Sequence, residues 1–279
     1  MKKKIFLIFF TLIVIVLSCL QEKKVHWVAI GDSITYLNDH LEETGNRVTK
    51  GYLTVVNETF PNWEVTNKGY NGWTAIRVAE NFKSLNIPRA DIYTLFLGTN
   101  DWWTGNPLGT LSDFEENNGL ATVLGAFRII IDNIRELNPK AKIILISPMQ
   151  RVDFVYINNY SNNAFGSYFS KNQQWLEDFA SQIVLLGKYE GYETIDLYHH
   201  PILQHNNLVA FKRLKNPNTG SYDNYPYPEF IDIPFTPEED DYPYPESAIR
   251  MTYDGLHPSD AGNEVIAEEI ITLFKTFVF

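Results

Sequence analysis

The sequence has almost no cysteine and a shortage of positive charge. Cys19 is the only cysteine in 279 residues, so an internal disulfide is excluded and no thiol pair exists for a zinc site. Lysine and arginine number 23 against 34 aspartate and glutamate, and the net charge of −11 gives little support for binding a nucleic-acid backbone. The Gly-x-Ser-x-Gly, Walker and dinucleotide-binding patterns are absent too. We therefore expect no nucleic-acid partner, no organic cofactor and no metal.

Long apolar runs are also missing, except at the N-terminus. Three lysines at positions 2–4 precede an apolar run over residues 5–17, which is shorter than the ~20 residues of a membrane span. A basic head before a short apolar segment is typical of a secretory signal. Residues 16–19, Val-Leu-Ser-Cys, resemble the lipobox of bacterial lipoproteins. The resemblance implies that residues 1–18 are removed and that an acylated Cys19 anchors the protein in the bacterial envelope. The alternative is an ordinary apolar cysteine within a signal or anchor helix.

The rest of the chain alternates short apolar runs with helical patterns. Strands are expected at residues 25–30, 63–69, 91–98, 142–148 and 192–197. Helices are expected at residues 47–60, 74–85, 120–137, 173–188 and 261–274. This alternation predicts right-handed crossovers and a parallel sheet covered by helices on both faces. We therefore expect a short tether over residues 19–24 and a single three-layer α/β/α domain over residues 25–279.

Two segments do not follow the alternation. Residues 99–119 are expected to form a long loop. Residues 206–251 are rich in Pro, Tyr and Asp and contain the similar stretches DNYPYPEF and DDYPYPES. Long segments without regular structure are usually functional or disordered, and Tyr-Pro alternation favours extended backbone. We interpret residues 206–251 as an ordered flap inserted into the domain, not as a second domain.

A candidate nucleophile follows the first predicted strand. In the stretch AIGDSIT, Ser33 comes directly after the apolar run, where the chain must turn. Ligands of parallel α/β sheets bind beyond the carboxyl ends of the strands, so a hydroxyl at this edge suits nucleophilic catalysis. Asp-Ser is also ordinary turn chemistry, and Ser33 has the alternative interpretation of a helix cap.

The groups that would activate this serine lie elsewhere in the chain. Asp254 and His257 are three residues apart, so one helix-like turn would place both side chains on the same side. His257 could take the proton of Ser33 while Asp254 fixes the imidazole tautomer. Gly69 and Gly72 at the end of the second strand would expose backbone N–H groups, and Asn100 at the end of the third would supply a side-chain amide. The structural alternatives are a turn glycine, a loop-binding asparagine and a histidine and aspartate that cap or fill the core.

Four blocks of the sequence together resemble a known family. They are Gly31-Asp32-Ser33-Ile34, Asn67 to Gly72, Gly98-Thr99-Asn100-Asp101 and Asp254 to His257. In this order they resemble the conserved blocks of the SGNH hydrolases, also called GDSL-type esterases and lipases. The resemblance implies a flavodoxin-like α/β fold and ester hydrolysis through an acyl-serine. It also implies Ser33, Asp254 and His257 as catalytic residues and the N–H groups of Ser33, Gly72 and Asn100 as the oxyanion hole.

The substrate is less well determined by the sequence. Trp73, Trp102 and Trp103 lie beside the predicted site and either stack on a sugar ring or pack the flap down. With the breadth of the family and the secretion signal, they favour removal of acetyl or other short acyl groups from carbohydrate. A lysophospholipase or short-chain lipase is the alternative within the fold. A glycan-binding lipoprotein without catalysis is the alternative of another class.

A histidine cluster raises one further possibility. His199, His200 and His205 lie close together in the sequence and could suggest a metal site with Asp196. Their spacing matches no strong ligand pattern. We therefore interpret them as loop histidines near the fifth strand.

Overall fold

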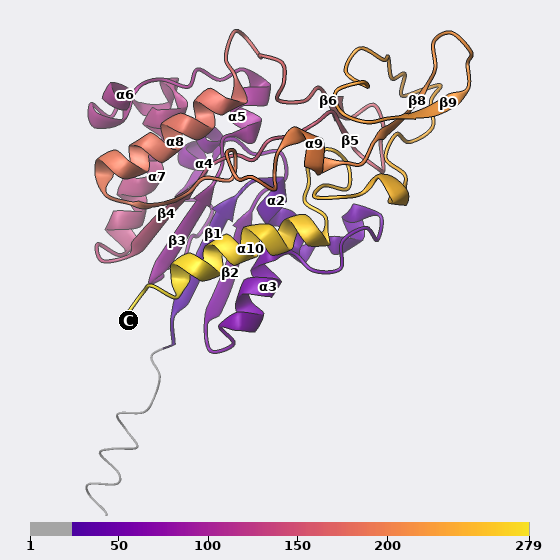
Figure 1. The fold of residues 1–279 in the computed structure, drawn as a ribbon. Coiled ribbons are helices and arrows are strands. Elements are labelled where there is room, and N and C mark those ends of the chain that lie inside the picture. The colour runs from indigo at the N-terminus through magenta and orange to yellow at the C-terminus, as the bar shows by residue number, and fades with distance from the viewer. Residues whose placement is uncertain (1–23, 279) are drawn as a thin grey trace, which may run out of the picture.

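A five-stranded parallel sheet forms the centre of the computed structural model, which describes residues 24–278 (Figure 1). The strands are β1 (His26–Gly31), β2 (Glu64–Gly69), β3 (Ile92–Phe96), β4 (Lys142–Ile146) and β7 (Glu193–Ile195). They lie in the order β2-β1-β3-β4-β7, and all neighbouring pairs are parallel. The predicted sheet is thereby confirmed. The signal peptide and Cys19 lie outside the described residues.

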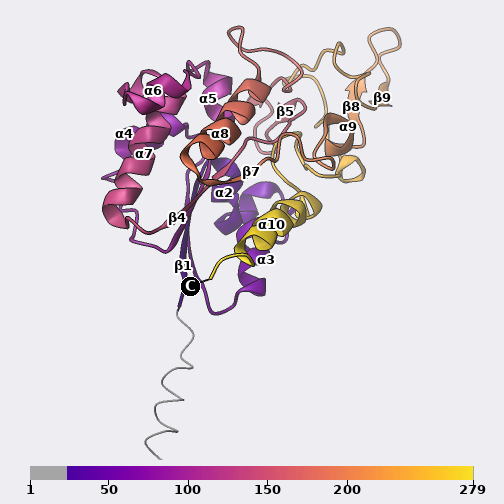
Figure 2. The same ribbon diagram turned by 60° about the vertical axis from the view of Figure 1, so that its left-hand side comes forward.

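Helices cover both faces of this sheet (Figures 1 and 2). One face carries α3 (Tyr52–Thr59) and α10 (Asp260–Phe274). The other carries α4 (Ala75–Asn81), α7 (Val123–Leu137) and α8 (Leu176–Glu190). Successive strand residues point to opposite faces, so Trp27 and Ala29 of β1 join the first core while Val28 and Ile30 join the second. The predicted three-layer α/β/α architecture is therefore confirmed.

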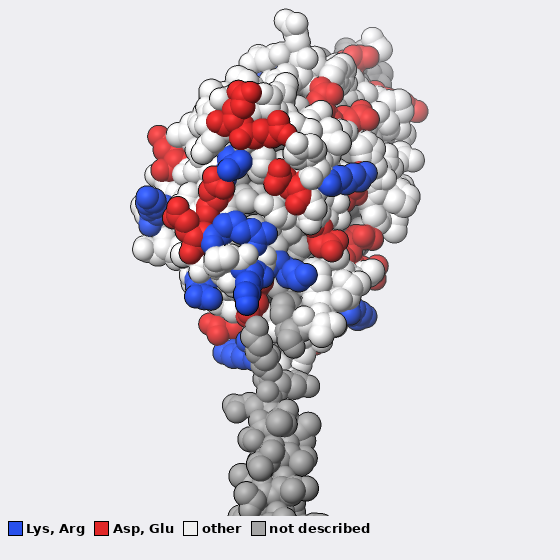
Figure 3. Space-filling view, turned by 90° about the vertical axis from the view of Figure 1, so that its left-hand side faces the viewer, with Lys and Arg blue, Asp and Glu red and all other residues white. Residues whose placement is uncertain are grey.

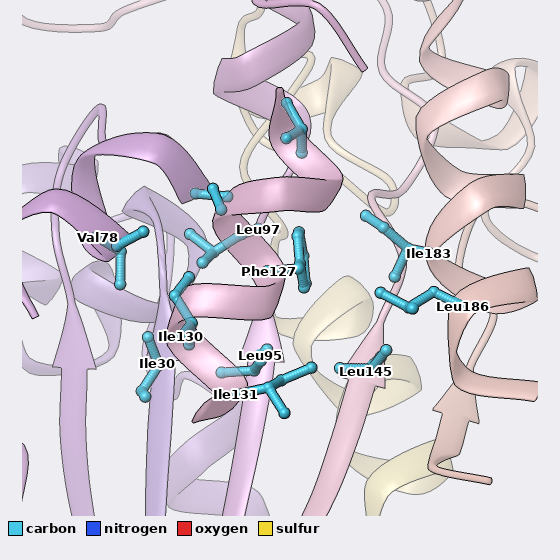
Figure 4. Close-up of a cluster of buried hydrophobic side chains, with 14 of the residues drawn as sticks. Ile30, Val78, Leu95, Leu97, Phe127, Ile130, Ile131, Leu145, Ile183 and Leu186 are labelled. Atoms are coloured by element: carbon cyan, nitrogen blue, oxygen red, sulfur yellow. The ribbon is translucent and has the colours of Figure 1, made fainter. Parts of the chain in front are cut away.

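The core between the sheet and α7 explains why the central strands read as almost continuous apolar runs. Figure 4 shows Leu95 of β3 and Leu145 of β4 facing Phe127 and Ile131 of α7 and Leu186 of α8. All five side chains are buried. Burying a side chain of this kind stabilises the fold by roughly 1.5–3 kcal/mol. Since both faces of these strands are covered, apolar residues occupy most positions on both faces.

The structure contains two short helices where the sequence predicted a loop over residues 99–119. This segment contains α5 (Thr99–Thr104) and α6 (Leu111–Glu115). Gly105 ends α5 with a φ of +77°, and the side chains of Thr110 and Asp113 cap the start of α6. Both helices are too short to show an apolar periodicity, so only their caps could have indicated them.

The boundaries of the first long helix also differ from the prediction. The helix expected over residues 47–60 begins only at Tyr52, because the backbone N–H groups of Thr49 and Lys50 donate to the Asp260 carboxylate instead (2.7 and 3.3 Å). Gly51 then caps the helix. Thr49 and Lys50 therefore tie the start of α3 to α10.

Two irregular segments extend beyond the carboxyl ends of the strands (Figure 1). The first contains the short antiparallel pair β5 (Phe154–Val155) and β6 (Asn163–Ala164). The second is the flap of residues 206–251, in which β8 (Lys212–Lys215) pairs with β9 (Tyr222–Tyr225). Phe230 and Tyr244 of the flap are fully buried, so the flap packs onto the body of the protein.

The remaining elements are short. They are α2 (Ser33–Tyr36), α9 (His205–Leu208) and the 3-10 turns η1 (Leu37–Asp39), η2 (Leu41–Thr44), η3 (Gly119–Ala121) and η4 (Glu246–Ala248). Among the described residues, every helix is too short or too polar to cross a membrane. The segment that places the candidate nucleophile is α2, at the end of β1.

Candidate active site

Ser33 is the first residue of α2 and lies at the carboxyl end of β1. The side chain of Asp32 caps this short helix by accepting a hydrogen bond from the Ile34 N–H at 3.0 Å. Asp32 is buried, and desolvation raises its pKa to about 6, although the Ile34 N–H and the nearby His257 oppose the shift. The carboxylate therefore holds the turn that presents the Ser33 hydroxyl.

Ser33, His257 and Asp254 form a continuous chain of hydrogen bonds. The Ser33 Oγ lies 2.8 Å from His257 Nε2, and His257 Nδ1 lies 2.7 Å from Asp254 Oδ2. Asp254 is fully buried. Its other oxygen accepts from the backbone N–H groups of Leu256 (3.0 Å) and His257 (2.7 Å). Because the carboxylate accepts from Nδ1, Nε2 is left to accept the proton of the serine hydroxyl.

The turn that carries Asp254 and His257 depends on a glycine between them. Gly255 has a φ of +92°, and a Cβ there would lie 2.0 Å from the carbonyl oxygen of Asp153. The imidazole of His257 is held between two aromatic rings. Tyr253 stacks on it with a centroid distance of 6.0 Å, and Phe154 meets it edge to face at 5.3 Å. The backbone turn and the packing of the two aromatic rings therefore both restrict the orientation of the His257 imidazole.

Three N–H donors lie at the ends of β1, β2 and β3. The backbone N–H groups of Ser33 and Gly72 have no hydrogen-bond partner within residues 24–278. Gly72 is exposed and has a φ of +72°. The side-chain amide of Asn100 donates to the carbonyl of Trp73 at 3.0 Å. One of its two N–H bonds remains, since an asparagine amide carries two.

A buried carboxylate links the Gly72 turn to α5. Asp101 accepts a hydrogen bond from the backbone N–H of Ala75, the first residue of α4, at 2.8 Å. It also accepts from the Asn106 side chain at 3.3 Å. Desolvation raises the pKa of Asp101 to about 6. The Asp101 carboxylate lies at the start of α4, which matches the preference of helix N-termini for negative charge.

The three tryptophans of the predicted substrate site have different positions. Trp102 is fully buried in the core, and its indole N–H donates to the Gln174 carbonyl at 3.0 Å. This corrects the prediction for Trp102, because a ring without exposed surface cannot stack on a substrate. Trp73 is partly buried and stacks on Tyr70. Trp103 is partly buried too and lines a surface cleft.

Sequence reasoning missed residues that follow β4. Arg151 is buried, and its guanidinium lies 5.0 and 4.9 Å from the ring centroids of Trp102 and Trp103. It donates to the Phe165 carbonyl at 2.7 Å, and desolvation lowers its pKa to about 10. Phe154 contacts His257 directly. The only sequence signal that could have indicated these residues was the position of this segment beyond the carboxyl end of β4.

The loop histidines do not converge on a common point. His199 lies 2.9 Å from Asp196, whereas His205 hydrogen-bonds to Ser167 at 2.7 Å. His200 faces a glutamate of α10 at 3.5 Å. The metal site considered from their sequence spacing is therefore not assembled.

Another group of potential metal ligands lies on the surface. The ligand atoms of His40, Glu42 and Glu43 lie within 4.8 Å of one another. The Nδ1 atom of His40 already lies 3.4 and 3.9 Å from carboxylate oxygens of the two glutamates, and its ring stacks on Tyr36. Their contacts with one another account for this arrangement without an ion.

Comparisons with known proteins agree with this geometry. The model of the GDSL-like lipase/acylhydrolase family matches residues 29–218, which include Ser33, Gly72 and Asn100. The structure of a possible lipase from Chitinophaga pinensis is 59% identical, with a TM-score of 0.89 and coverage of 90% of this chain and 98% of that one. A protein from Lactobacillus plantarum shares only the fold, at 18% identity and a TM-score of 0.59, over 92% of this chain and 99% of its own. No curated protein matches the sequence. The chain is an ester hydrolase and belongs to the GDSL-like lipase/acylhydrolase family.

Proposed function

We propose that this hydrolase works through an acyl-serine intermediate and removes acetyl or other short acyl groups from carbohydrate. The observation that carries the catalytic part is the unbroken hydrogen-bond chain from Ser33 Oγ through His257 to Asp254. Its distances, 2.8 and 2.7 Å, are within the range expected of a nucleophile, its general base and the group that orients the base.

The reaction has two half-reactions. His257 Nε2 takes the hydroxyl proton while Ser33 Oγ bonds to the ester carbonyl carbon, and the same nitrogen then protonates the departing alcohol oxygen. The acyl group is left on Ser33. His257 next takes a proton from water, the water oxygen attacks the acyl carbon, and Ser33 recovers its proton as the carboxylic acid leaves. Asp254 stays ionised and stabilises the imidazolium in both steps.

The charge that develops on the carbonyl oxygen requires donors already in place. We assign this role to the backbone N–H groups of Ser33 and Gly72 and to the free N–H of Asn100. None of the three needs to break an existing protein hydrogen bond within the described chain. Loss of one such donor typically lowers turnover by ~10²–10³.

The proposed location is the bacterial envelope, with a lipid anchor on Cys19. The lipobox-like sequence supports the anchor, and the position where the described chain begins supports one orientation of the sheet relative to the membrane. β1 begins at the sheet edge opposite Ser33, and the exposed Lys24, Arg89 and Lys142 precede or open β1, β3 and β4 at that edge. Figure 3 shows basic side chains gathered toward this end of the molecule. The catalytic edge would thus face away from the bilayer, which favours a glycan over a membrane lipid as substrate.

Labelling with a fluorophosphonate probe tests the catalytic proposal without knowledge of the substrate. We expect covalent labelling of the wild type and loss of labelling in Ser33→Ala. Ser167→Ala is a matched control, because Ser167 also lies 2.7 Å from a histidine ring nitrogen, but no carboxylate of the described residues hydrogen-bonds to that ring, which belongs to His205. An unlabelled wild type, or labelling that survives in Ser33→Ala, would contradict the assignment.

Hydrolysis assays test the substrate class. Rates on p-nitrophenyl acetate, butyrate and longer esters, compared with rates on acetylated glycans, separate the carbohydrate proposal from a lipase. A preference for long acyl chains or for lysophospholipid would contradict the carbohydrate proposal. If wild type and Ser33→Ala are equally inert and the protein still retains glycan, it is a binding module instead.

A further inference from the structure

A cleft of about 280 Å³ lies between the β5–β6 segment and the flap. Its apolar walls come from three parts of the chain that are distant in sequence. They are formed by Trp103 of α5, Phe154 and Phe165 of the β5–β6 segment, and Ile231, Ile233 and Phe235 of the flap. The flap therefore builds one wall of a cavity and does not merely cover the core.

This cleft adjoins the catalytic histidine. Phe154, which lines the cleft, also meets the His257 ring edge to face at 5.3 Å. The next residue, Val155, donates its backbone N–H to the carbonyl of Asp254 at 3.1 Å. On the other side, Trp103 comes three residues after Asn100 in α5, so both side chains lie on one side of that helix. The cleft thus lies next to the candidate reaction centre and shares the Phe154 side chain with it.

Its position beside His257 indicates which half of an ester it would receive. In the acylation step, the histidine delivers its proton to the departing alcohol oxygen. The alcohol portion of the substrate must therefore lie next to the imidazole. A cleft whose wall contacts that imidazole is placed for the alcohol portion and not for the acyl group.

The lining residues indicate the chemistry of the ligand. Lys212 and Asp153, the charged pair at the cleft, already have partners within the protein. Asp153 accepts hydrogen bonds from Lys212 at 2.7 Å, from the Gly166 N–H at 2.9 Å and from the Tyr168 hydroxyl. What remains open to a ligand is a mixed surface, in which polar groups such as the exposed Asn163 lie beside aromatic and aliphatic side chains. A pyranose ring matches this pattern, because it has an apolar C–H face and a polar edge. The volume is slightly below the ~300 Å³ at which sites for drug-sized ligands begin, which fits a single ring.

We propose that this cleft is a subsite for one sugar ring in the alcohol portion of the ester. The inference rests on the proposed function, which it deepens by assigning the sugar to a defined place. Trp103 and Phe235 provide ring surfaces from the body and the flap, so the flap determines specificity.

The test compares two acetyl esters with different alcohols. One is a methyl pyranoside that carries a single acetyl group, and the other is ethyl acetate, whose alcohol is too small to fill the cleft. In Trp103→Ala and in Phe235→Ala, we expect the ratio of the two kcat/KM values to fall at least tenfold, mainly through KM for the sugar ester. Trp175→Ala is the matched control, because Trp175 is 47% exposed and lies outside the cleft. Its ratio should remain that of the wild type.

Two variants are used because Trp103 also packs on Arg151 and Lys171, and thermal unfolding identifies a variant that is simply misfolded. An unchanged ratio in folded Phe235→Ala overturns the inference while leaving ester hydrolysis intact. A changed preference among acetyl, butyryl and hexanoyl esters of one alcohol also overturns it, because the cleft would then hold the acyl group. A wild type that hydrolyses no ester and is not labelled at Ser33 instead contradicts the proposed function, and the subsite with it.

Discussion

The side-chain amide of Asn100 donates a hydrogen bond to the backbone carbonyl of Trp73 at 3.0 Å. This bond joins the segments that follow β3 and β2. Because Trp73 comes directly after Gly72, the same amide that has a free N–H also fixes the turn carrying the Gly72 N–H. Two of the three proposed oxyanion donors are therefore coupled, and they should be lost together when the Asn100 amide is removed.

Asn100→Ala should lower kcat by ~10²–10³ or slightly more, with little change in KM, because the donors act mainly on the transition state. The fold should survive, since one hydrogen bond of a partly exposed side chain contributes only ~0.5–1.5 kcal/mol. Steady-state kinetics and circular dichroism check this. The control is Asn133→Ala, which removes an amide that donates to a backbone carbonyl in α7 at 2.7 Å. Turnover near the wild-type value in Asn100→Ala would remove Asn100 from the site.

Gly72 and Gly191 provide a matched pair of glycines. They have φ values of +72° and +71°, and a Cβ at either position would meet no heavy atom within 4 Å. Alanine at each should therefore cost a similar ~1–2 kcal/mol of stability, from backbone conformation alone. Only Gly72→Ala should also lower kcat, because the strain would displace the N–H next to the substrate. Urea unfolding and ester kinetics on both variants separate the effects, and equal activities would argue against a role for Gly72.

The sequence was sufficient to predict the central sheet and the residues that meet at its carboxyl edge. Ser33, Gly72 and Asn100 each follow a strand, and in a parallel sheet such positions share one edge. Asp254 and His257 are three residues apart, which the Gly255 turn converts into a hydrogen bond of 2.7 Å. Local spacing and one topological rule thus account for most of the site, whereas the family resemblance was needed to select Gly72 over Gly69.

The lining of the site could not be predicted in the same way. Trp102 and Trp103 are adjacent in a helix that was not predicted from the sequence, so their different degrees of burial could not be predicted from composition. Phe154 reaches His257 through an irregular segment with two-residue strands. Contacts of this kind depend on tertiary packing of segments far apart in the chain, and no local pattern encodes them.

Lys212→Met should destabilise the protein by ~3–5 kcal/mol, because it leaves the Asp153 carboxylate largely buried without its cation. The Lys212 and Asp153 side chains are 4% and 17% exposed, and their charged atoms lie 2.7 Å apart. Lys50→Met is the control, since Lys50 pairs with Glu58 at the same distance but with both side chains about half exposed. The loss of stability in Lys50→Met should be ~0–1 kcal/mol. Similar losses in the two variants, measured by urea unfolding, would contradict the buried-pair argument.

His205 should make the fold sensitive to mild acid. Desolvation lowers its pKa from 6.5 to about 4. It hydrogen-bonds to Ser167 at 2.7 Å, and the ring of Tyr227, a flap residue, stacks on it at 5.3 Å. The unfolded chain takes up a proton as pH falls through 6.5, whereas the folded protein does so only near pH 4. The contribution of His205 to the free energy of unfolding is therefore fully present above pH 6.5 and is lost as pH falls toward 4.

The free energy of unfolding of wild type and His205→Gln, measured from pH 8 to pH 4, isolates this effect. Asp32 and Asp101 act in the opposite direction, because burial raises each pKa to about 6 and protonation below that pH relieves the cost of the buried charge. Both groups are present in both proteins, so their effect cancels in the difference. That difference should be constant between pH 7.5 and 8 and should shrink progressively below pH 6.5, because only the wild type loses the His205 contribution. Parallel curves down to pH 4 would mean that His205 is protonated as readily in the folded protein as in the unfolded chain, and its packing against the flap residue Tyr227 would then not restrict its charge.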